Sequence, residues 1–252
     1  MTDSEIKSFL DEKVDKYNQR SYFFKDDPIG LPNQFTLKED IEIIGFLVAT
    51  IAWGKRQMII KNGQNLIDIM GGQPHQFILN ANAADLKDIK FVHRTFNTID
   101  LNYFIKALQE IYNKSLSLED LFANHKGSMA NKIFHFRSEF LSFGPEKRTE
   151  KHVSNPLKNS SAKRINMYLR WMVRNDQRKV DFGIWNKISP SELYCPLDVH
   201  TGNVARKLGL IDRKTNDWKA LEELMKHLRA FDSNDPVKYD FALFGLGVYE
   251  GF

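Results

Sequence analysis

Hydrophobic residues repeat along most of this chain with the spacing of an α-helix. Near the N-terminus, Ile6, Phe9, Leu10 and Val14 recur three or four positions apart, a period that places side chains on one helix face. The pattern predicts helices over residues 4–18, 36–53, 57–70, 100–112, 118–122, 129–143, 161–174, 201–208, 214–228 and 236–246. No segment alternates apolar and polar residues as a strand does. We therefore predict an all-α fold of about a dozen helices.

Two local signals refine this pattern. Thr36 and Glu39 form a capping-box pattern at the start of residues 36–53, in which each side chain would bond to the other residue's backbone. The rest of that segment is almost wholly apolar, which predicts a buried central helix. Gly144-Pro145 breaks the chain. We therefore predict a single helical domain over residues 1–252, with a lobe boundary near 144–145.

The composition is that of an ordinary globular protein. The 252 residues are 42% hydrophobic and 27% charged, which excludes a disordered chain. Cys195 is the only cysteine, so a disulfide framework, a cysteine-rich zinc site and a four-cysteine iron–sulfur cluster are excluded. No apolar run reaches the roughly 18 residues of a membrane span, and the acidic N-terminus lacks a signal-peptide core. We therefore expect a cytoplasmic protein with no membrane partner.

The net charge of +4 is unevenly distributed. Residues 147–179 contain ten Lys or Arg residues and two acids, a net charge of +8, so the rest of the chain carries −4. One basic segment on a slightly acidic body is typical of a polyanion-binding site. A solvated helix face gives the same pattern, and composition by itself leaves both interpretations open.

Two short stretches carry the candidate chemistry. Residues 157–165 form a polar turn that enters an amphipathic helix, with Lys163 and Arg164 in its first turn. Backbone N–H groups and the positive end of a helix attract an anion there. Residues 195–210 place Asp198 where a helix N-cap belongs. Capping alone also explains that aspartate, so its position does not by itself indicate a catalytic group.

Together the two stretches resemble the helix–hairpin–helix DNA glycosylase superfamily, the group of endonuclease III. Residues 157–165 match the family's hairpin without a gap, and residues 196–200 (Pro-Leu-Asp-Val-His) match its catalytic segment. In this comparison Lys163 falls on the catalytic lysine of the bifunctional members, and Asp198 falls on the catalytic aspartate. Trp53 falls on the family's DNA-wedging glutamine. Within the superfamily, the C-terminal half is most similar to a bacterial family of unknown function.

The resemblance implies a two-lobed helix–hairpin–helix DNA glycosylase-like fold. It also implies a DNA-repair enzyme, a DNA N-glycosylase or AP lyase that cleaves the N-glycosidic bond of a damaged base. The partner would be double-stranded DNA, bound by a monomer with no metal or other cofactor. The residues expected to contact DNA are Asn159, Ser160, Ser161, Arg164, Arg170, Arg174, Trp53 and His200.

Lys163 and Asp198 are the residue types that this reaction needs. Breaking an N-glycosidic bond builds positive charge on the sugar, and a fixed carboxylate beside C1′ stabilises that charge. The helix dipole favours the anion of an N-cap aspartate. A lysine amine can attack C1′ and form a Schiff base, which permits strand cleavage. Because the base must leave the duplex, Trp53 would fill the gap; a core tryptophan at a helix end is the other interpretation.

The sequence departs from the family's pattern in two respects. Asn159 and Ser161 replace the hairpin glycines, and Asn adopts a left-handed turn more readily than Ser. Lys163 and Asp198 are further apart than in the family, and the extra residues, 176–193, include aromatic side chains that we expect to pack rather than face a substrate. A non-catalytic DNA-binding module of the same fold is the main alternative. A metal-dependent all-α phosphohydrolase ranks below it, because the seven histidines form no HD or HxxxH pair.

Overall fold

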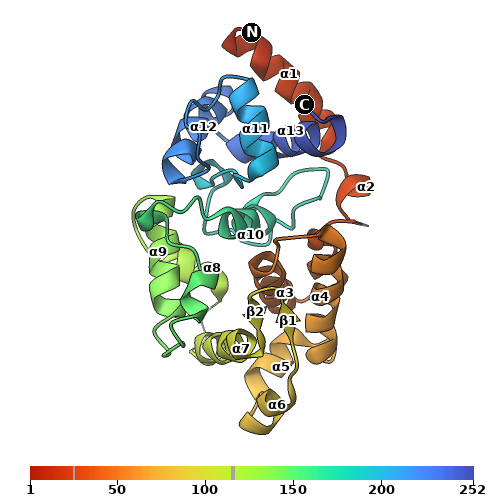
Figure 1. Cartoon of the computed structure of the whole chain (residues 1–252), viewed down its shortest axis with the longest axis vertical. Helices are drawn as coiled ribbons and strands as arrows, with labels where there is room; N and C mark the ends of the chain where they lie inside the picture. The colour runs from red at the N-terminus through yellow and green to blue at the C-terminus, as the bar shows by residue number, and fades with distance from the viewer. Residues whose placement is uncertain (25, 115–116) are drawn as a thin grey trace. The chain divides into compact units, whose positions relative to one another are not determined.

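The computed structural model describes residues 1–24, 26–114 and 117–252. Within these ranges the chain is all-α, as predicted, with thirteen α-helices and a single pair of two-residue strands. The helices form two compact units (Figure 1): a middle unit of residues 24–154, and a terminal unit of residues 1–23 and 155–252. Every helix in the described ranges is too short or too polar to cross a bilayer.

The middle unit is built around α3. It contains α3 (Lys38–Thr50), α4 (Arg56–Ile69), α5 (Pro74–Asn80), α6 (Ala83–Asp88), β1 (Val92–His93), β2 (Phe96–Asn97), α7 (Thr98–Asn113), α8 (Leu118–Ala123) and α9 (Met129–Phe140). Phe46 of α3 stacks on Phe104 of α7, with 5.6 Å between ring centroids, and meets Phe136 and Phe140 of α9 edge-on. Residues 41–50 of α3 are all buried. An apolar helix is stable when it is covered on all sides in this way, so the predicted buried central helix is confirmed.

The capping box predicted at Thr36 and Glu39 is wrong. The helix α3 begins at Lys38, its N-cap residue is Leu37, and no side-chain hydrogen bond caps it. Most helix stability in proteins comes from packing of the apolar face rather than from local end signals. The burial of α3 therefore fixes this helix without the predicted cap.

The two units meet in sequence at Ser154–Asn155, beyond the Gly144-Pro145 break. Gly144 has φ of 73° and follows the end of α9, but the chain then returns to α7. The buried Asp100 carboxylate of α7 accepts hydrogen bonds from Arg148 Nη1 and Thr149 Oγ1, both at 2.8 Å. These bonds keep the segment after the break in the middle unit, which is why the break is not the boundary.

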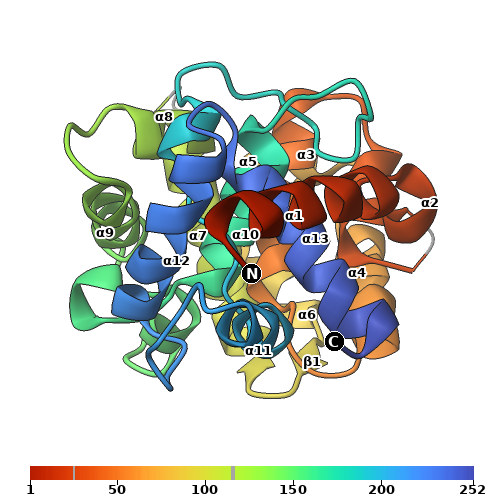
Figure 2. The same cartoon turned by 90° about the horizontal axis from the view of Figure 1, so that it is seen from above.

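The terminal unit joins the two ends of the chain. It contains α1 (Asp3–Tyr17), α2 (Arg20–Phe23), α10 (Lys163–Val173), α11 (Val199–Lys207), α12 (Trp218–Phe231), α13 (Tyr239–Gly245) and a π-helix (Leu246–Glu250). α1 lies across α13 (Figure 2). Gly245 permits this approach, because a Cβ atom there would overlap the Tyr17 ring. The Tyr17 hydroxyl also donates to Glu250 (2.5 Å), so α1 packs on α13 and is hydrogen-bonded to the π-helix that follows it.

Candidate functional site

Asp198 is the N-cap of α11, as its position in the sequence predicted. Its backbone is extended (φ −108°, ψ −169°), and its Oδ1 accepts a hydrogen bond from the Thr201 N–H at 2.9 Å. The side chain is half-buried. Capping fixes the carboxylate at the positive end of the helix. The capping bond uses Oδ1 and does not involve the second carboxylate oxygen, Oδ2.

A loop before α12 fixes the backbone of Asp198. The Asn216 side chain donates from Nδ2 to the Asp198 carbonyl (2.7 Å) and accepts at Oδ1 from Arg206 (2.6 Å). Arg206 Nε in turn donates to the Arg213 carbonyl (2.7 Å). Gly202 makes room for this amide, because a Cβ atom there would lie 2.5 Å from Asn216 Oδ1. No pattern in the sequence marks Asn216 for this role.

The predicted hairpin is a tight turn with two left-handed residues. A 3₁₀ turn over Pro156–Lys158 leads into Asn159 (φ 64°), and Ala162 (φ 48°) is the N-cap of α10. Asn159 therefore adopts the left-handed conformation for which glycine is otherwise preferred. The second left-handed position is Ala162, one residue after the position of Ser161 that the family comparison indicated. No side chain caps α10 at its N-terminus.

The hairpin is bonded to the start of α12. The Asn159 carbonyl accepts from the Trp218 N–H (3.2 Å), and its Nδ2 donates to Asp217 (3.1 Å). Two hydrogen bonds from Arg213 to Asp217 (3.1 and 2.6 Å) lower the pKa of this carboxyl and keep it ionised. Asn159 thus holds the hairpin on α12, a structural role beside its predicted DNA contact. Through Arg213 and Arg206, the same network continues to Asp198.

Asp240 of α13 is a buried carboxyl group whose pKa depends on the charges around it. Burial is the largest influence and raises the pKa of Asp240 to about 6, whereas the positive charge of Arg170 lowers it. The negative charge of Asp198 raises this pKa further, and the positive charge of Lys163 lowers it. Charge interactions of this kind fall off with distance and with solvent screening. Lys163 is the first residue of α10 and Asp198 is the N-cap of α11, so both stand at helix starts in the terminal unit.

The expectation that Arg170 and Arg174 lie on an exposed DNA-binding face is wrong. Both are buried, at 4% and 3% exposure. Arg170 pairs with Asp181 (3.1 Å) and Asp240, while Arg174 pairs with Asp181 (3.2 Å). Asp176 and Asp235 are further partners of Arg174. Helical spacing correctly places both arginines on a different face of α10 from its apolar stripe. Other parts of the terminal unit cover the face that carries the arginines.

The residues between α10 and α11 pack in the way we favoured. Trp185 is 2% exposed and meets Tyr168 edge-on, with 5.4 Å between ring centroids. The N–H groups of Phe182 and Trp185 donate to the carbonyls of Trp171 (2.8 Å) and Met172 (2.9 Å). This segment therefore satisfies carbonyl groups at the end of α10, which would otherwise lack partners. It also supplies Asp181, which pairs with both arginines.

The other predicted contacts in the terminal unit differ in exposure. His200 is exposed in the first turn of α11, whereas Ser160, Ser161 and Arg164 are half-buried at the hairpin. Burial lowers the pKa of Arg164 to about 10, which still leaves it charged at neutral pH. Lys219 was missed by the sequence reasoning. It is exposed, and its N–H donates to Asn159 Oδ1 (3.4 Å), so a further cation lies beside the hairpin.

Trp53, in the middle unit, is half-buried. It meets His93 edge-on at 5.0 Å and stacks on His152 at 6.1 Å, measured between ring centroids. His93 Nε2 lies 3.1 Å from the Trp53 carbonyl and its Nδ1 lies 2.8 Å from Asn62 Nδ2. A carbonyl only accepts, so Nε2 carries the proton. Burial lowers the pKa of His93, and a neutral histidine thus fixes the backbone of Trp53.

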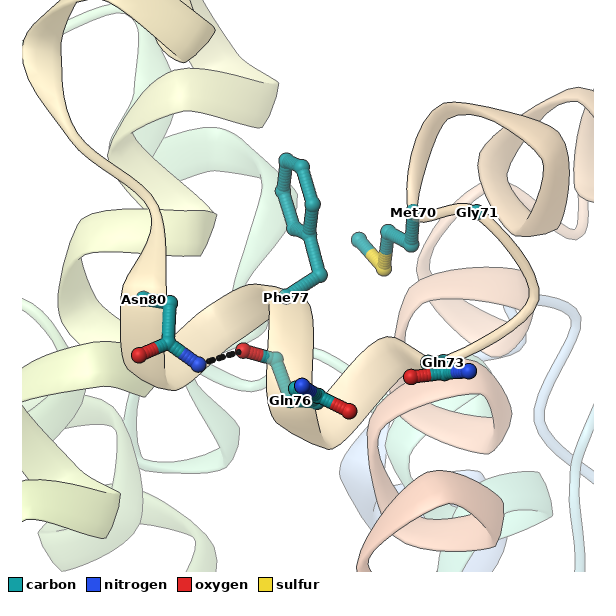
Figure 3. Close-up of a pocket in the computed structure, with 6 residues that line it drawn as sticks. All are labelled: Met70, Gly71, Gln73, Gln76, Phe77 and Asn80. Carbon is teal, nitrogen blue, oxygen red and sulfur yellow. Dashed lines mark hydrogen bonds between the residues drawn. The ribbon is translucent and has the colours of Figure 1, made fainter.

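A surface hollow of about 520 Å³ lies at the end of α4 (Figure 3). Its lining is made of side-chain amides, two apolar side chains and a glycine: Met70, Gly71, Gln73, Gln76, Phe77 and Asn80. None of these groups titrates, so they supply no general acid, base or nucleophile. Elsewhere in the described ranges, no three His, Cys, Asp or Glu side chains converge to hold a metal ion. The Asp198 region therefore remains the candidate site.

Comparison with known proteins identifies the family. A family described as "Protein of unknown function (DUF2400)" matches residues 27–249. The chain therefore belongs to the DUF2400 family. No curated protein and no solved structure matches the chain.

Proposed function

We propose that this DUF2400 protein binds double-stranded DNA and acts on a damaged or abasic nucleotide as a DNA N-glycosylase or AP lyase. In this proposal the fold is the two-lobed helix–hairpin–helix arrangement of the DNA glycosylases. The protein acts as a monomer in the cytoplasm. One observation carries the proposal: Lys163 and Asp198 are 35 residues apart, yet each stands at the start of a helix in the same compact unit, Lys163 in α10 and Asp198 at the N-cap of α11. A nucleophile and an anion that serve one reaction must be held by one folded unit.

Each residue would have a distinct role. The Lys163 amine attacks C1′ of the sugar. At an abasic site, where C1′ is an aldehyde, the amine and the carbonyl form a Schiff base and release water. With a base still attached, the base leaves and Asp198 balances the positive charge that develops on the sugar. The capping bond from Thr201 to Asp198 Oδ1 keeps this carboxylate in place during the reaction.

Borohydride trapping on an abasic duplex tests the reaction. Borohydride reduces the Schiff base to a stable amine, so wild type should form a covalent complex with DNA. Lys163→Ala should lose the complex, while replacement of an exposed lysine of α7, Lys106→Ala, serves as the matched control and should keep it. Asp198→Asn should fold normally, because Asn caps a helix about as well as Asp, but should lose excision of a damaged base.

The trapping result separates the candidate functions. Trapping that survives Lys163→Ala but is lost in Lys158→Ala would move the nucleophile to Lys158. If wild type binds duplex DNA, traps nothing and excises no base from a broad lesion panel, the protein is a non-catalytic binding module. A protein that does not bind DNA would refute both functions.

For the DNA surface, we propose the exposed cations at the hairpin in place of the buried arginines. Lys158 lies in the hairpin and Lys219 lies beside it, and both are exposed. Replacing both with Glu should weaken binding to all sequences alike. It should also make the slope of log K against log salt less steep, by about 0.9 for each phosphate that the protein no longer neutralises. The exposed Lys106 of α7 provides a charge-reversal control. An unchanged slope in the double variant would refute this surface.

A further inference from the structure

Three consecutive residues at the start of α12, Asn216, Asp217 and Trp218, contact both stretches of the candidate site. On one side, Asn216 Nδ2 donates to the Asp198 carbonyl at 2.7 Å. The Trp218 ring packs against the ring of Tyr194, four residues before Asp198, with 4.8 Å between ring centroids. Residues 216–218 are therefore joined by two separate contacts to the chain at and before Asp198.

The same three residues are bonded to the hairpin that leads into α10. The Trp218 N–H donates to the Asn159 carbonyl (3.2 Å), and Asn159 Nδ2 donates to the Asp217 carboxylate (3.1 Å). Ser160 and Asp217 also pair as an isolated antiparallel β-bridge. Lys163 follows three residues after Ser160. The start of α10 is thus tied to the same residues as the N-cap of α11.

Residues 216–218 are themselves held in one geometry. Two nitrogens of Arg213 donate to Asp217 (3.1 and 2.6 Å), and Asp217 caps α12 by accepting from the Ala220 N–H (2.9 Å). Trp218 is 6% exposed, and its Nε1 donates to Glu222 one turn further along α12 (3.0 Å). Side chains that are locked by packing and by further hydrogen bonds hold a neighbouring site precisely. Residues 216–218 can therefore act as a fixed link between the hairpin and Asp198.

We propose that Asn216 is a positioning residue of the candidate site: its amide fixes the Asp198 backbone relative to the hairpin that leads to Lys163. The inference rests on the proposed function, since it takes Lys163 and Asp198 as the reacting pair. The Asp198 carbonyl accepts from Nδ2 (2.7 Å), and Arg206 donates to Oδ1 (2.6 Å). One short amide supplies both the donor and the acceptor, whereas an aspartate of the same shape supplies acceptors alone. Asn216 acts through Asp198 and is not itself a reacting group.

Asn216→Asp tests this role without DNA. The variant keeps an acceptor for Arg206, but it loses the donor and places an oxygen atom against the Asp198 carbonyl. The Thr201 N–H, which donates to Asp198 Oδ1, reports on the order of the cap. Its hydrogen exchange, measured by NMR on the whole protein, should become about tenfold faster, because the Asp198 carbonyl loses its hydrogen bond.

Thr215→Val is the matched control. The Thr215 hydroxyl lies in the same loop and donates to Asp217 (2.9 Å), so this variant removes one hydrogen bond without touching Asp198. It should leave the exchange rate of Thr201 unchanged. An unchanged rate in Asn216→Asp, or an equal acceleration in Thr215→Val, would overturn the inference. If Asn216→Asp does not fold, Asn216→Ala, which introduces no charge, is measured in the same way and decides by the same outcomes.

Kinetics on DNA distinguish positioning from a general loss of structure. Base excision at saturating DNA should fall about tenfold in Asn216→Asp, because a displaced carboxylate stabilises the reacting sugar less well. The Kd for duplex DNA should stay at the wild-type value, since the exposed cations of the proposed DNA surface are unchanged. A variant that loses DNA affinity to the same extent as excision would overturn the positioning role.

The two measurements also separate the inference from the proposed function. Thr201 exchange that responds to Asn216→Asp in a protein that excises no base would keep Asn216 as the residue that orders Asp198 and would refute the glycosylase. Excision that is insensitive to Asn216→Asp would keep the glycosylase and refute the inference.

Discussion

Replacing Arg170 with Met should destabilise the terminal unit strongly. Arg170 is 4% exposed, pairs with Asp181 and Asp240, and lies 4.4 Å from the centroid of the Phe241 ring. Met has a similar length and no charge, so the change removes the guanidinium with little loss of volume. Asp181 keeps Arg174 as a partner (3.2 Å). Asp240 keeps the hydrogen bond from the Cys195 thiol and loses its ion-pair partner.

The expected loss of unfolding free energy arises because the Asp240 carboxylate stays buried without its ion-pair partner. Removing one partner of a buried ion pair costs about 3–5 kcal/mol, because the other charge remains buried without compensation. With a slope of about 3 kcal/mol per molar urea, a cost of about 4 kcal/mol lowers the urea midpoint by roughly 1 M. The cost should be smaller at pH 5 than at pH 8, because burial favours the protonated form of a stranded carboxyl group.

Urea unfolding followed by tryptophan fluorescence measures this cost. Trp171 and Trp185 are both buried in the terminal unit and report on its unfolding. Arg178→Met is the matched control: this arginine pairs with Asp15 at the surface, where the side chains are 34% and 73% exposed, and such pairs contribute about 0–1 kcal/mol. Combining Arg170→Met with Asp240→Asn should recover part of the loss, because the stranded charge is also removed.

A midpoint shift for Arg170→Met no larger than that for Arg178→Met would refute the buried network. Such a result would instead support the prediction from the sequence that Arg170 is exposed. A second result would also refute it: the double variant Arg170→Met/Asp240→Asn being less stable than Arg170→Met at pH 8. The unpaired Asp240 charge would then not be the cause of the lost stability.

Three further changes test other parts of the structure. The pKa of Asp240 is about 6 when folded and near 4 when unfolded, so its contribution to stability is complete below pH 4 and is lost as the pH rises through 6. In urea unfolding, the free energy of unfolding of the wild type should fall by about 3 kcal/mol relative to that of Asp240→Asn over this pH range. Parallel plots of unfolding free energy against pH for the two proteins would contradict this. Gly202→Ala should cost about 1–3 kcal/mol by displacing Asn216, although Gly to Ala within a helix ordinarily stabilises; a gain in thermal stability would refute the Asn216 bond. Trp53→Ala should lower thermal stability by less than the 3–5 kcal/mol of a core tryptophan, because the ring is half-buried, and a full loss would show that Trp53 is a core residue.

Helix positions followed directly from the hydrophobic period. The predicted segments 4–18 and 57–70 match α1 (Asp3–Tyr17) and α4 (Arg56–Ile69) to within one residue at each end. Both helices have one buried face, which the 3.6-residue period records. The sequence reasoning missed the short α5 and α6, and α6 has no buried residue among its six. A helix without a buried face leaves no periodic signal.

The candidate site was only partly visible in the sequence. Asp198 could be found because a cap involves residues three apart, here Asp198 and Thr201. Asn216 holds the Asp198 backbone from 18 residues away, and Asp240 lies further along the chain still. No local pattern marks such partners, since an Asn or Asp in a loop or short helix has many ordinary roles.

The sequence by itself determined the all-α class, the main helices and the cap at Asp198, because each depends on residues within a few positions of one another. Only the tertiary structure decided which charges face solvent. Arg170, Arg174 and Arg178 lie in one basic run, yet the first two are buried in ion pairs and the third pairs at the surface. The carboxylates that accept Arg170 come from the segment after α10 and from α13, and a charge is buried only where folding brings such partners to it.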